Sequence, residues 1–403
     1  MRLKTFSEKN QIKLLVHMKK KTKKHYKMCN RCIMDTSDPS ITFNKKGLCR
    51  HCVEYDHLVS IGIFDGQDGL DRLEKIIHEI KEYGHNKKYD CIIGLSGGLD
   101  SSYTLHKICE YELRPLVVHL DNGWNSELAV SNISKLLTKL DIDLDTYVIP
   151  WNEFKDLQIS FLYASTPDIE IVTDHAITSY MYQAAKKNNI KYIISGSNIR
   201  TETHVPLSWS QGHNDWKYIE SVQKKFGSVP ITSYPHRTRE EDLDFKNNFK
   251  WLAPLNYLEY KKYKAINLLS DVYDWKYYSG KHYESIFTRF YQGYILPRKF
   301  GYDKRRGHLS SLICSGEVER DEALLEMTRP PYPDEIQRKD YDYVIKKLDL
   351  SKEEFEKIMD LPLKTILDYP SYATDDLYKT KRTLYSSFIR NLKGLKNSFI
   401  KNV

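Results

Sequence analysis

One short segment of the sequence has the residue types and spacing expected of a phosphate-binding site. Ser96-Gly97-Gly98-Leu99-Asp100-Ser101-Ser102 follows the apolar run 91–95 and precedes a stretch with helical periodicity. At the start of a helix, unpaired backbone N–H groups and the helix dipole favour an anion. Gly97 and Gly98 let the backbone approach phosphate oxygens closely, because they carry no Cβ. The segment predicts a loop that binds phosphate groups.

The side chains of this loop fit the same prediction. Ser96, Ser101 and Ser102 offer hydroxyl donors, and Asp100 is expected to help hold a Mg²⁺ ion that bridges the phosphates. The Walker pattern is absent, because no lysine follows the glycines. The alternative interpretation is an ordinary glycine-rich turn between a strand and a helix.

A second group with chemical potential is a set of four cysteines. Cys29 and Cys32 form one C-x₂-C pair, Cys49 and Cys52 form another, and sixteen residues separate the pairs. Two such turns can complete a tetrahedral site, and four thiolates with no open position suit a structural Zn²⁺. A disulfide pair, disfavoured in the cytosol, and an iron–sulfur cluster are the alternatives. His51, inside the second pair, is expected to be a bystander.

The elements that must position the loop are strands and helices in alternation. Between residues 89 and 198 the pattern predicts strands over 89–95, 115–120, 146–149 and 192–195, with helices over 101–112, 126–140 and 174–188. An amphipathic helix is expected over 70–83. Such alternation favours an α/β fold, a doubly wound parallel sheet with helices on both faces.

Beyond about residue 200 the pattern becomes mainly helical. Helices are expected over 266–273, 283–294, 309–313, 319–328 and 352–360. Four parts are predicted: a basic tail (1–28), a zinc-binding module (29–60), an ATP-binding α/β domain (61–205) and a mainly helical region for substrate or partner (206–403).

Charge and composition narrow the possible partners. The formal net charge is +8, but residues 1–28 hold ten Lys or Arg and one acid, so the remainder sums to −1. The tail could touch an anionic membrane surface or nucleic acid, or be a solvated extension. The neutral body gives no electrostatic case for nucleic acid as a partner. With 40% hydrophobic residues, short apolar runs and no secretory leader pattern, a soluble cytoplasmic protein is expected.

The loop S-G-G-x-D-S resembles the PP-loop of the ATP pyrophosphatases. The resemblance implies cleavage of ATP between the α and β phosphates, with AMP and pyrophosphate as products. It also implies nucleotide contacts after two later strands, where Asp121 and Gly196 stand in 119–123 and 195–198. The alternative for either segment is an ordinary turn, in which Asp, Asn, Gly and Ser are common.

From Cys29 to about Leu325 the chain resembles the N-acetyl sugar amidotransferases of bacterial surface-polysaccharide and flagellin-sugar pathways. The stretches that carry the resemblance are 28–36, the loop, 194–199, 215–216, 281–285, 287–292, 299–301, 303–306 and 308–310. The resemblance implies that ATP and ammonia convert a sugar N-acetyl group into an acetamidino group through an O-adenylyl imidate. Ammonia would come from a partner glutaminase, with a cyclase-like subunit as a further partner.

Charged residues after position 280 are candidates for the sugar side of such a site. Arg289, Arg305 and Arg306, with Lys304, could hold the diphosphate of a nucleotide-linked sugar. His282 or Glu284 could take protons from the incoming ammonia. A structural network of ion pairs between helices is the alternative.

Two other functions are compatible with parts of the pattern. A tRNA-thiolating enzyme also joins such a loop to zinc-binding cysteines, but only Cys91, Cys109 and Cys314 remain outside the two pairs, and they form no C-x₂-C pair. A non-catalytic nucleotide-binding scaffold is disfavoured by the intact Ser96, Asp100 and Ser101. The same three cysteines offer no evident glutaminase nucleophile, so a separate ammonia source is expected.

Overall fold

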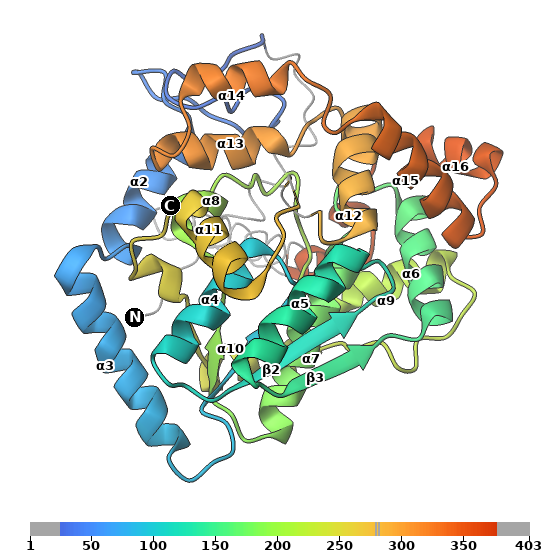
Figure 1. Ribbon diagram of the computed structural model, residues 1–403. Coiled ribbons are helices and arrows are strands. Elements are labelled where there is room, and N and C mark those ends of the chain that lie inside the picture. The colour runs from blue at the N-terminus through green and yellow to red at the C-terminus, as the bar shows by residue number, and fades with distance from the viewer. Residues whose placement is uncertain (1–24, 279, 281–282, 377–403) are drawn as a thin grey trace, which may run out of the picture.

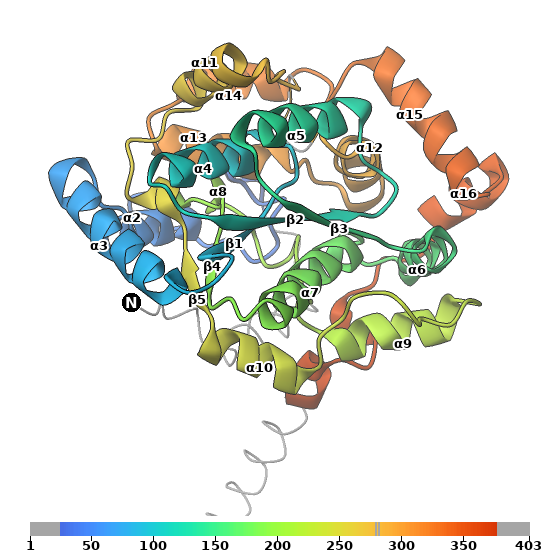
Figure 2. The same cartoon turned by 60° about the horizontal axis from the view of Figure 1, so that its bottom comes forward.

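The computed structural model describes residues 25–278, 280 and 283–376 of the 403-residue chain. Five strands form one parallel sheet in the order β3-β2-β1-β4-β5. Strands β2 and β3 are labelled in Figure 1, and all five are labelled in Figure 2. The strands are β1 (Cys91–Gly94), β2 (Pro115–Asp121), β3 (Leu144–Val148), β4 (Tyr192–Ile194) and β5 (Lys250–Leu252). The predicted parallel α/β sheet is therefore confirmed.

Helices occupy most of the remaining described chain. Around the sheet they are α2 (Arg50–Gly62), α3 (Gly66–Gly84), α4 (Leu99–Glu110), α5 (Glu127–Leu140), α6 (Trp151–Ala164), α7 (Ile171–Lys187), α8 (Ile199–Glu202), α9 (Trp216–Phe226), α10 (Arg239–Asn248) and α11 (Lys262–Tyr273). Towards the C-terminus they are α12 (Ile286–Phe290), the π-helix η2 (Tyr291–Phe300), α13 (Arg305–Cys314), α14 (Arg320–Met327), α15 (Asp334–Lys347) and α16 (Lys352–Met359), with short 3₁₀ turns η1 (Pro254–Asn256) and η3 (Ile366–Asp368).

Helices cover both faces of the sheet (Figure 2). Alternate residues of β1 point to opposite faces, as expected for a strand. Ile93 packs in the core that includes side chains of α4, α5 and α11, whereas Ile92 packs with side chains of α7 and α10. This two-sided burial explains why the β1 sequence is a continuous apolar run.

The strand order fixes the position of the ligand crevice. From β1 the chain passes to β2 and β3 on one side of the sheet, whereas β4 and β5 lie on the other side. In open α/β sheets, ligands bind at the carboxyl ends of the strands where the order reverses, here between β1 and β4. Ile93 pairs with Ile194, so the loops that follow β1 and β4 emerge next to each other.

The sheet extends beyond residue 205, where the sequence pattern changes. Lys250–Leu252 pairs in parallel with β4 as the edge strand, and Ser195 N donates to Leu252 O at 2.8 Å. None of the described helices combines the length and apolar character needed to cross a membrane.

Candidate functional site

The loop after β1 packs closely against α5 and is hydrogen-bonded by the segment that follows α11. Gly97 has a φ of +78°, in the left-handed region that favours glycine, and a Cβ there would lie 2.8 Å from Ala129 O. The Gly97 carbonyl accepts hydrogen bonds from Tyr278 Oη at 2.8 Å and Trp275 Nε1 at 3.1 Å. The segment after α11 therefore positions the loop that leads into α4.

A cavity of about 250 Å³ opens over this loop. Six of the residues predicted for the site line it: Ser96, Gly98, Asp100, Ser101, Gly196 and Glu284. A Cβ on Gly196 would lie 2.9 Å from Ser101 N, so only glycine lets the loop after β4 approach the start of α4 this closely. The structure thus brings the ends of β1 and β4 together around one cavity.

Two carboxylates flank the loop inside this cavity. Tyr260 donates a hydrogen bond to Asp100 Oδ1, and burial together with the Asp100 charge raises the pKa of Tyr260. Glu284 Oε1 would lie 3.3 Å from a Cβ on Gly98. The main chain of Glu284 is anchored by Ser126 N, which donates to its carbonyl at 2.8 Å. Carboxylate oxygens beside a phosphate loop are donors that suit Mg²⁺.

A second cavity of about 600 Å³ adjoins the first. Seven residues line both cavities: Thr201, Glu202, Lys262, Tyr277, Gly280, His308 and Leu312. The larger cavity is also lined by three predicted sugar-side residues, Arg289, Lys304 and Arg305. The two spaces therefore share a wall, with acidic, basic and imidazole groups at their junction.

The three predicted sugar-side cations of the larger cavity differ in their partners. Arg289 makes a bidentate pair with Asp340, with both N–O distances 2.7 Å. Arg305 pairs with Asp303 at 2.7 Å and donates to the carbonyls of residues 329 and 330. Lys304 has no ion pair within 4 Å in the described part of the chain, and its charge acts on Asp168 and Glu170. Lys304 thus differs from the two arginines, each of which has a close carboxylate partner.

Four predicted site residues lie elsewhere, and one lies outside the described residues. Asp121 Oδ1 accepts from Gly123 N at 2.8 Å in the turn after β2, and Asp121 lines neither cavity. Arg306 binds Ile33 O at 2.6 Å and Asp35 at 3.1 Å, so it fastens the cysteine module to α13. Gly97 and Ser102 are buried beneath the cavity as parts of the loop. His282 is the residue outside the described part.

The structure adds site residues that the sequence did not indicate. Tyr260 and Lys262 come from the turn before α11 and its first residue, and Trp275 and Tyr278 come from the segment after it. No local motif marks them. A tyrosine-rich run around Trp275 is visible in the sequence, but its contact with Gly97 depends on tertiary packing.

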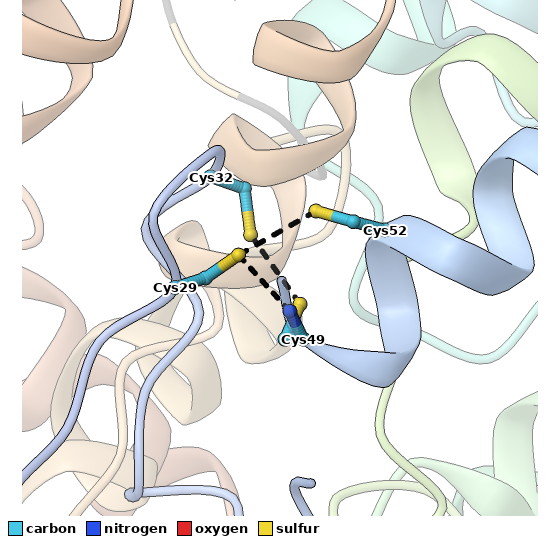
Figure 3. Close-up of side chains that lie close together, drawn as sticks. All are labelled: Cys29, Cys32, Cys49 and Cys52. Atoms are coloured by element: carbon cyan, nitrogen blue, oxygen red, sulfur yellow. Dashed lines mark hydrogen bonds between the residues drawn. The ribbon is translucent and has the colours of Figure 1, made fainter. Parts of the chain in front are cut away.

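The four paired cysteines converge in space, as the spacing predicts (Figure 3). Cys29 and Cys32 come from a turn, and Cys49 and Cys52 lie at the start of α2. Their sulfur atoms all lie within 4.8 Å of one another, and all four are fully buried free thiols. Backbone N–H groups of Met34 and Cys49 donate to Cys32 Sγ and Cys29 Sγ at 3.4 and 3.2 Å. This donor set could bind zinc.

Comparisons with known proteins give one family match. Residues 284–385 match the model described as LPS biosynthesis protein WbpG-like, C-terminal domain. No curated protein matches the chain.

Solved structures with detectable similarity include three synthetases. The NH₃-dependent NAD synthetase from Campylobacter jejuni subsp. jejuni NCTC 11168, in complex with the nitrate ion, has 13% identity and a TM-score of 0.29, covering 74% of this chain and 99% of its own. NMN synthetase from Francisella tularensis has 15% identity and a TM-score of 0.26, covering 55% and 97%. NAD⁺ synthetase from Burkholderia pseudomallei has 14% identity and a TM-score of 0.27, covering 75% and 98%. Of the chain itself, residues 284–385 are similar to the C-terminal domain of WbpG-like lipopolysaccharide-biosynthesis proteins.

Proposed function

We propose that this chain is an ATP-dependent amidotransferase that converts the N-acetyl group of a nucleotide-linked bacterial sugar into an acetamidino group. The observation that carries the proposal is the shared wall of the two cavities. One cavity has a phosphate-binding loop, and the adjoining one has room and charge for a polar acceptor. Such an arrangement allows the α-phosphorus of ATP and an acceptor oxygen to meet at the junction.

The chemistry needs an activated amide. Ammonia cannot expel oxide from an acetamido carbon, so the acetamido oxygen first attacks the α-phosphorus of ATP. The O–P bond forms as the bond to the bridging oxygen breaks, which releases pyrophosphate and leaves an O-adenylyl imidate. Ammonia then adds to the carbon, a proton is lost, and the C–O bond breaks with AMP as the leaving group. No protein nucleophile is needed, so positioning and charge neutralisation carry the catalysis.

The residues of the small cavity have defined tasks in this scheme. Backbone N–H groups at the start of α4, with the hydroxyls of Ser96 and Ser101, would hold the departing pyrophosphate. Asp100 and Glu284 would hold Mg²⁺, which neutralises phosphate charge when bound. Lys262, at the junction, adds the cation that the Walker-type lysine supplies in other loops.

The junction also carries proton acceptors for the incoming ammonia. His308 and Glu202 line both cavities, so either side chain could take the proton from ammonia that attacks at the junction. Lys304 in the larger cavity would face the anionic part of the sugar nucleotide. The match of residues 284–385 to a lipopolysaccharide-biosynthesis domain supports a sugar acceptor.

A structural zinc ion held by Cys29, Cys32, Cys49 and Cys52 belongs to the same proposal. Four sulfur ligands leave no coordination position for water, so this ion would stabilise the fold. Ammonia is proposed to come from a separate glutaminase subunit. Cys91 is buried in β1 and Cys109 lies in α4, so neither has the exposed turn that a glutaminase nucleophile needs.

The test is product identification with ATP, ammonium and a panel of N-acetylated nucleotide sugars. We expect pyrophosphate and AMP in equal amounts, together with a sugar in which NH replaces one oxygen. Asp100→Ala should abolish AMP formation while the chain still folds, with a stability loss of about 1–3 kcal/mol because the buried Tyr260 hydroxyl loses its acceptor. Asp71→Ala, on the exposed face of α3, should leave AMP formation unchanged. ADP as the nucleotide product, or near-normal turnover of Asp100→Ala, would refute the proposal.

A further inference from the structure

Two further metal-binding side chains contact the cysteine cluster from distant parts of the chain. Cys314, the last residue of α13, lies with its sulfur 3.7 Å from Cys52 Sγ. His204, just after α8, lies with Nε2 3.9 Å from Cys52 Sγ and 3.7 Å from Cys314 Sγ. Cys52 therefore contacts two donor groups in addition to Cys29, whose sulfur is 3.8 Å away.

These separations match those of ligands on one tetrahedral ion. With Zn–S bonds of about 2.3 Å, two sulfur ligands of a tetrahedral site lie about 3.8 Å apart. A Zn–N bond of about 2.0 Å brings a sulfur and an imidazole nitrogen to about 3.5 Å. The three contacts among Cys52, His204 and Cys314 are close to these values and share one vertex with the four-cysteine set.

The orientation of His204 supports a ligand role. The side chain is 1% exposed, and its Nδ1 lies 3.1 Å from Ser311 Oγ, which also accepts from the His204 N–H at 3.1 Å. A hydrogen bond at one ring nitrogen of a histidine ligand commonly fixes the other towards the metal. Nε2 is thereby directed at the sulfur atoms of Cys52 and Cys314.

The charge of the cluster favours a second cation. Four thiolates around one Zn²⁺ carry a net charge of −2 in a fully buried place. The arginines nearby do not donate to sulfur in the cluster: Arg320 donates to the carbonyls of Cys29 and Cys32, and Arg31 donates to Asp56 and to the Cys314 carbonyl. A second divalent ion, bound by one more thiolate and a neutral imidazole, would reduce the net negative charge of the cluster from −2 to −1.

We propose that Cys52, His204 and Cys314 bind a second divalent metal ion, with the Cys52 thiolate bridging it to the structural ion. Three protein ligands leave a fourth position for water or a ligand atom. His204, Ser311 and Leu312 also line the larger cavity, so this second ion would border the acceptor site. This proposal does not depend on the proposed reaction, because it rests only on the contacts among Cys52, His204 and Cys314.

The experiment is metal stoichiometry on the full chain, purified with zinc and dialysed against a weak chelator. We expect two zinc ions per chain in the wild type and in Cys109→Ser, a control thiol that is partly buried in α4. Cys314→Ser and His204→Gln should each retain one zinc ion. One zinc per chain in the wild type, or two in both of these variants, would overturn the assignment.

Thiol alkylation gives a second readout that does not depend on variants. A metal-bound Cys314 should resist iodoacetamide in the native protein and react only after a strong chelator removes the metal. Peptide mass mapping locates the modified residue. Alkylation of Cys314 at an unchanged zinc content would show that its sulfur is a free thiol, and the proposal would then fail.

Discussion

At the residue scale, the carbonyl of Gly97 collects hydrogen bonds from Trp275 and Tyr278, two residues far away in sequence. Replacing Gly97 by alanine should strain the left-handed backbone by about 1–2 kcal/mol. It should also force the new Cβ against Ala129 O, only 2.8 Å away. We expect Gly97→Ala to lower the melting temperature and to abolish ATP binding, measured by thermal shift and calorimetry.

A glycine with the same backbone conformation but no close neighbour serves as a control, because it separates backbone strain from steric clash of the new Cβ. Gly316 has a φ of +72°, but a Cβ there would meet nothing within 4 Å. Gly316→Ala should therefore show only the conformational cost, with ATP binding intact. Equal effects of the two substitutions on ATP affinity would mean that the fixed loop geometry is not needed for nucleotide binding.

Lys304 and Arg289 line the same cavity but should respond differently to loss of charge. Arg289 is paired with Asp340, whose side chain is 7% exposed, so Arg289→Met leaves a buried carboxylate unpaired, at a cost of about 3–5 kcal/mol. Lys304 lacks such a partner in the described part of the chain. Lys304→Met should raise the KM for the sugar nucleotide more than that for ATP, with a smaller loss of melting temperature than Arg289→Met.

Steady-state kinetics and thermal denaturation on both variants test this difference. Arg289→Met should show the larger loss of stability and Lys304→Met the larger change in sugar KM. The reverse pattern would mean that Arg289 is the residue that contacts the ligand anion.

At the element scale, Glu170 joins the start of α7 to α12 and η2. Its carboxylate accepts from Thr288 Oγ1 at 2.5 Å and from Gln292 Nε2 at 3.5 Å. Burial raises the pKa of Glu170 from an ordinary value of 4.5 to about 7, although Lys304 and Thr288 act in the opposite direction. The folded state therefore holds a proton that the unfolded state has lost between these pH values.

The sign of the pH dependence follows from this difference. Stability falls as pH rises wherever the folded state binds more protons. Glu170 should thus destabilise the fold progressively from pH 4.5 to about 7 and add no further change above it. Glu170→Gln should remove this component, so melting curves of the variant and the wild type should converge at low pH and diverge towards neutrality. A constant difference in melting temperature across this range would contradict the assignment.

Elements with a clear apolar period were predictable from the sequence, and others were not. The helix expected over 70–83 is α3, and the strands and helices expected between 89 and 195 correspond to β1–β4, α4, α5 and α7. Helix α6 was not predicted, because it buries polar Glu153 and Gln158 on its packed face. The three-residue strand β5 exists through its pairing with β4, a contact with no local signature.

The candidate site shows the same division. The loop 96–102 and the four cysteines were predictable, because each is a compact pattern of residue types at fixed spacing. Tyr260 and Trp275 were not, since their hydrogen bonds to Asp100 and Gly97 join segments more than a hundred residues apart. Expectations for charged residues were the least specific: among the predicted arginines, Arg306 contacts Asp35 instead of either cavity.

At the scale of the whole molecule, one helix connects the cysteine cluster with both cavities. Helix α13 carries His308 and Leu312, which line both spaces, and ends at Cys314 beside the cluster. Ser310 Oγ on the same helix accepts from Ile33 N at 3.3 Å. The cysteine module therefore supports the wall between the two cavities, although it lies outside the loop 96–102 in sequence.

The proposed need for a separate ammonia source can be tested on the purified chain. Cys91 and Cys109 lie inside regular elements, and Cys314 lies against the four-cysteine cluster. The purified chain should therefore turn over with high ammonium at alkaline pH, where free NH₃ is abundant, and remain inactive with glutamine. A glutaminase added in trans should restore turnover with glutamine. Steady turnover with glutamine alone, in a preparation free of other proteins, would contradict this expectation.

The most direct test of the central claim follows a single oxygen atom. If the acetamido oxygen attacks the α-phosphorus of ATP, that oxygen must leave with AMP. A substrate with oxygen-18 in the acetamido carbonyl should yield AMP that carries the heavy isotope, detected by mass spectrometry, together with unlabelled pyrophosphate. Unlabelled AMP, or label in inorganic phosphate alongside ADP, would show that the amide is not activated by adenylylation.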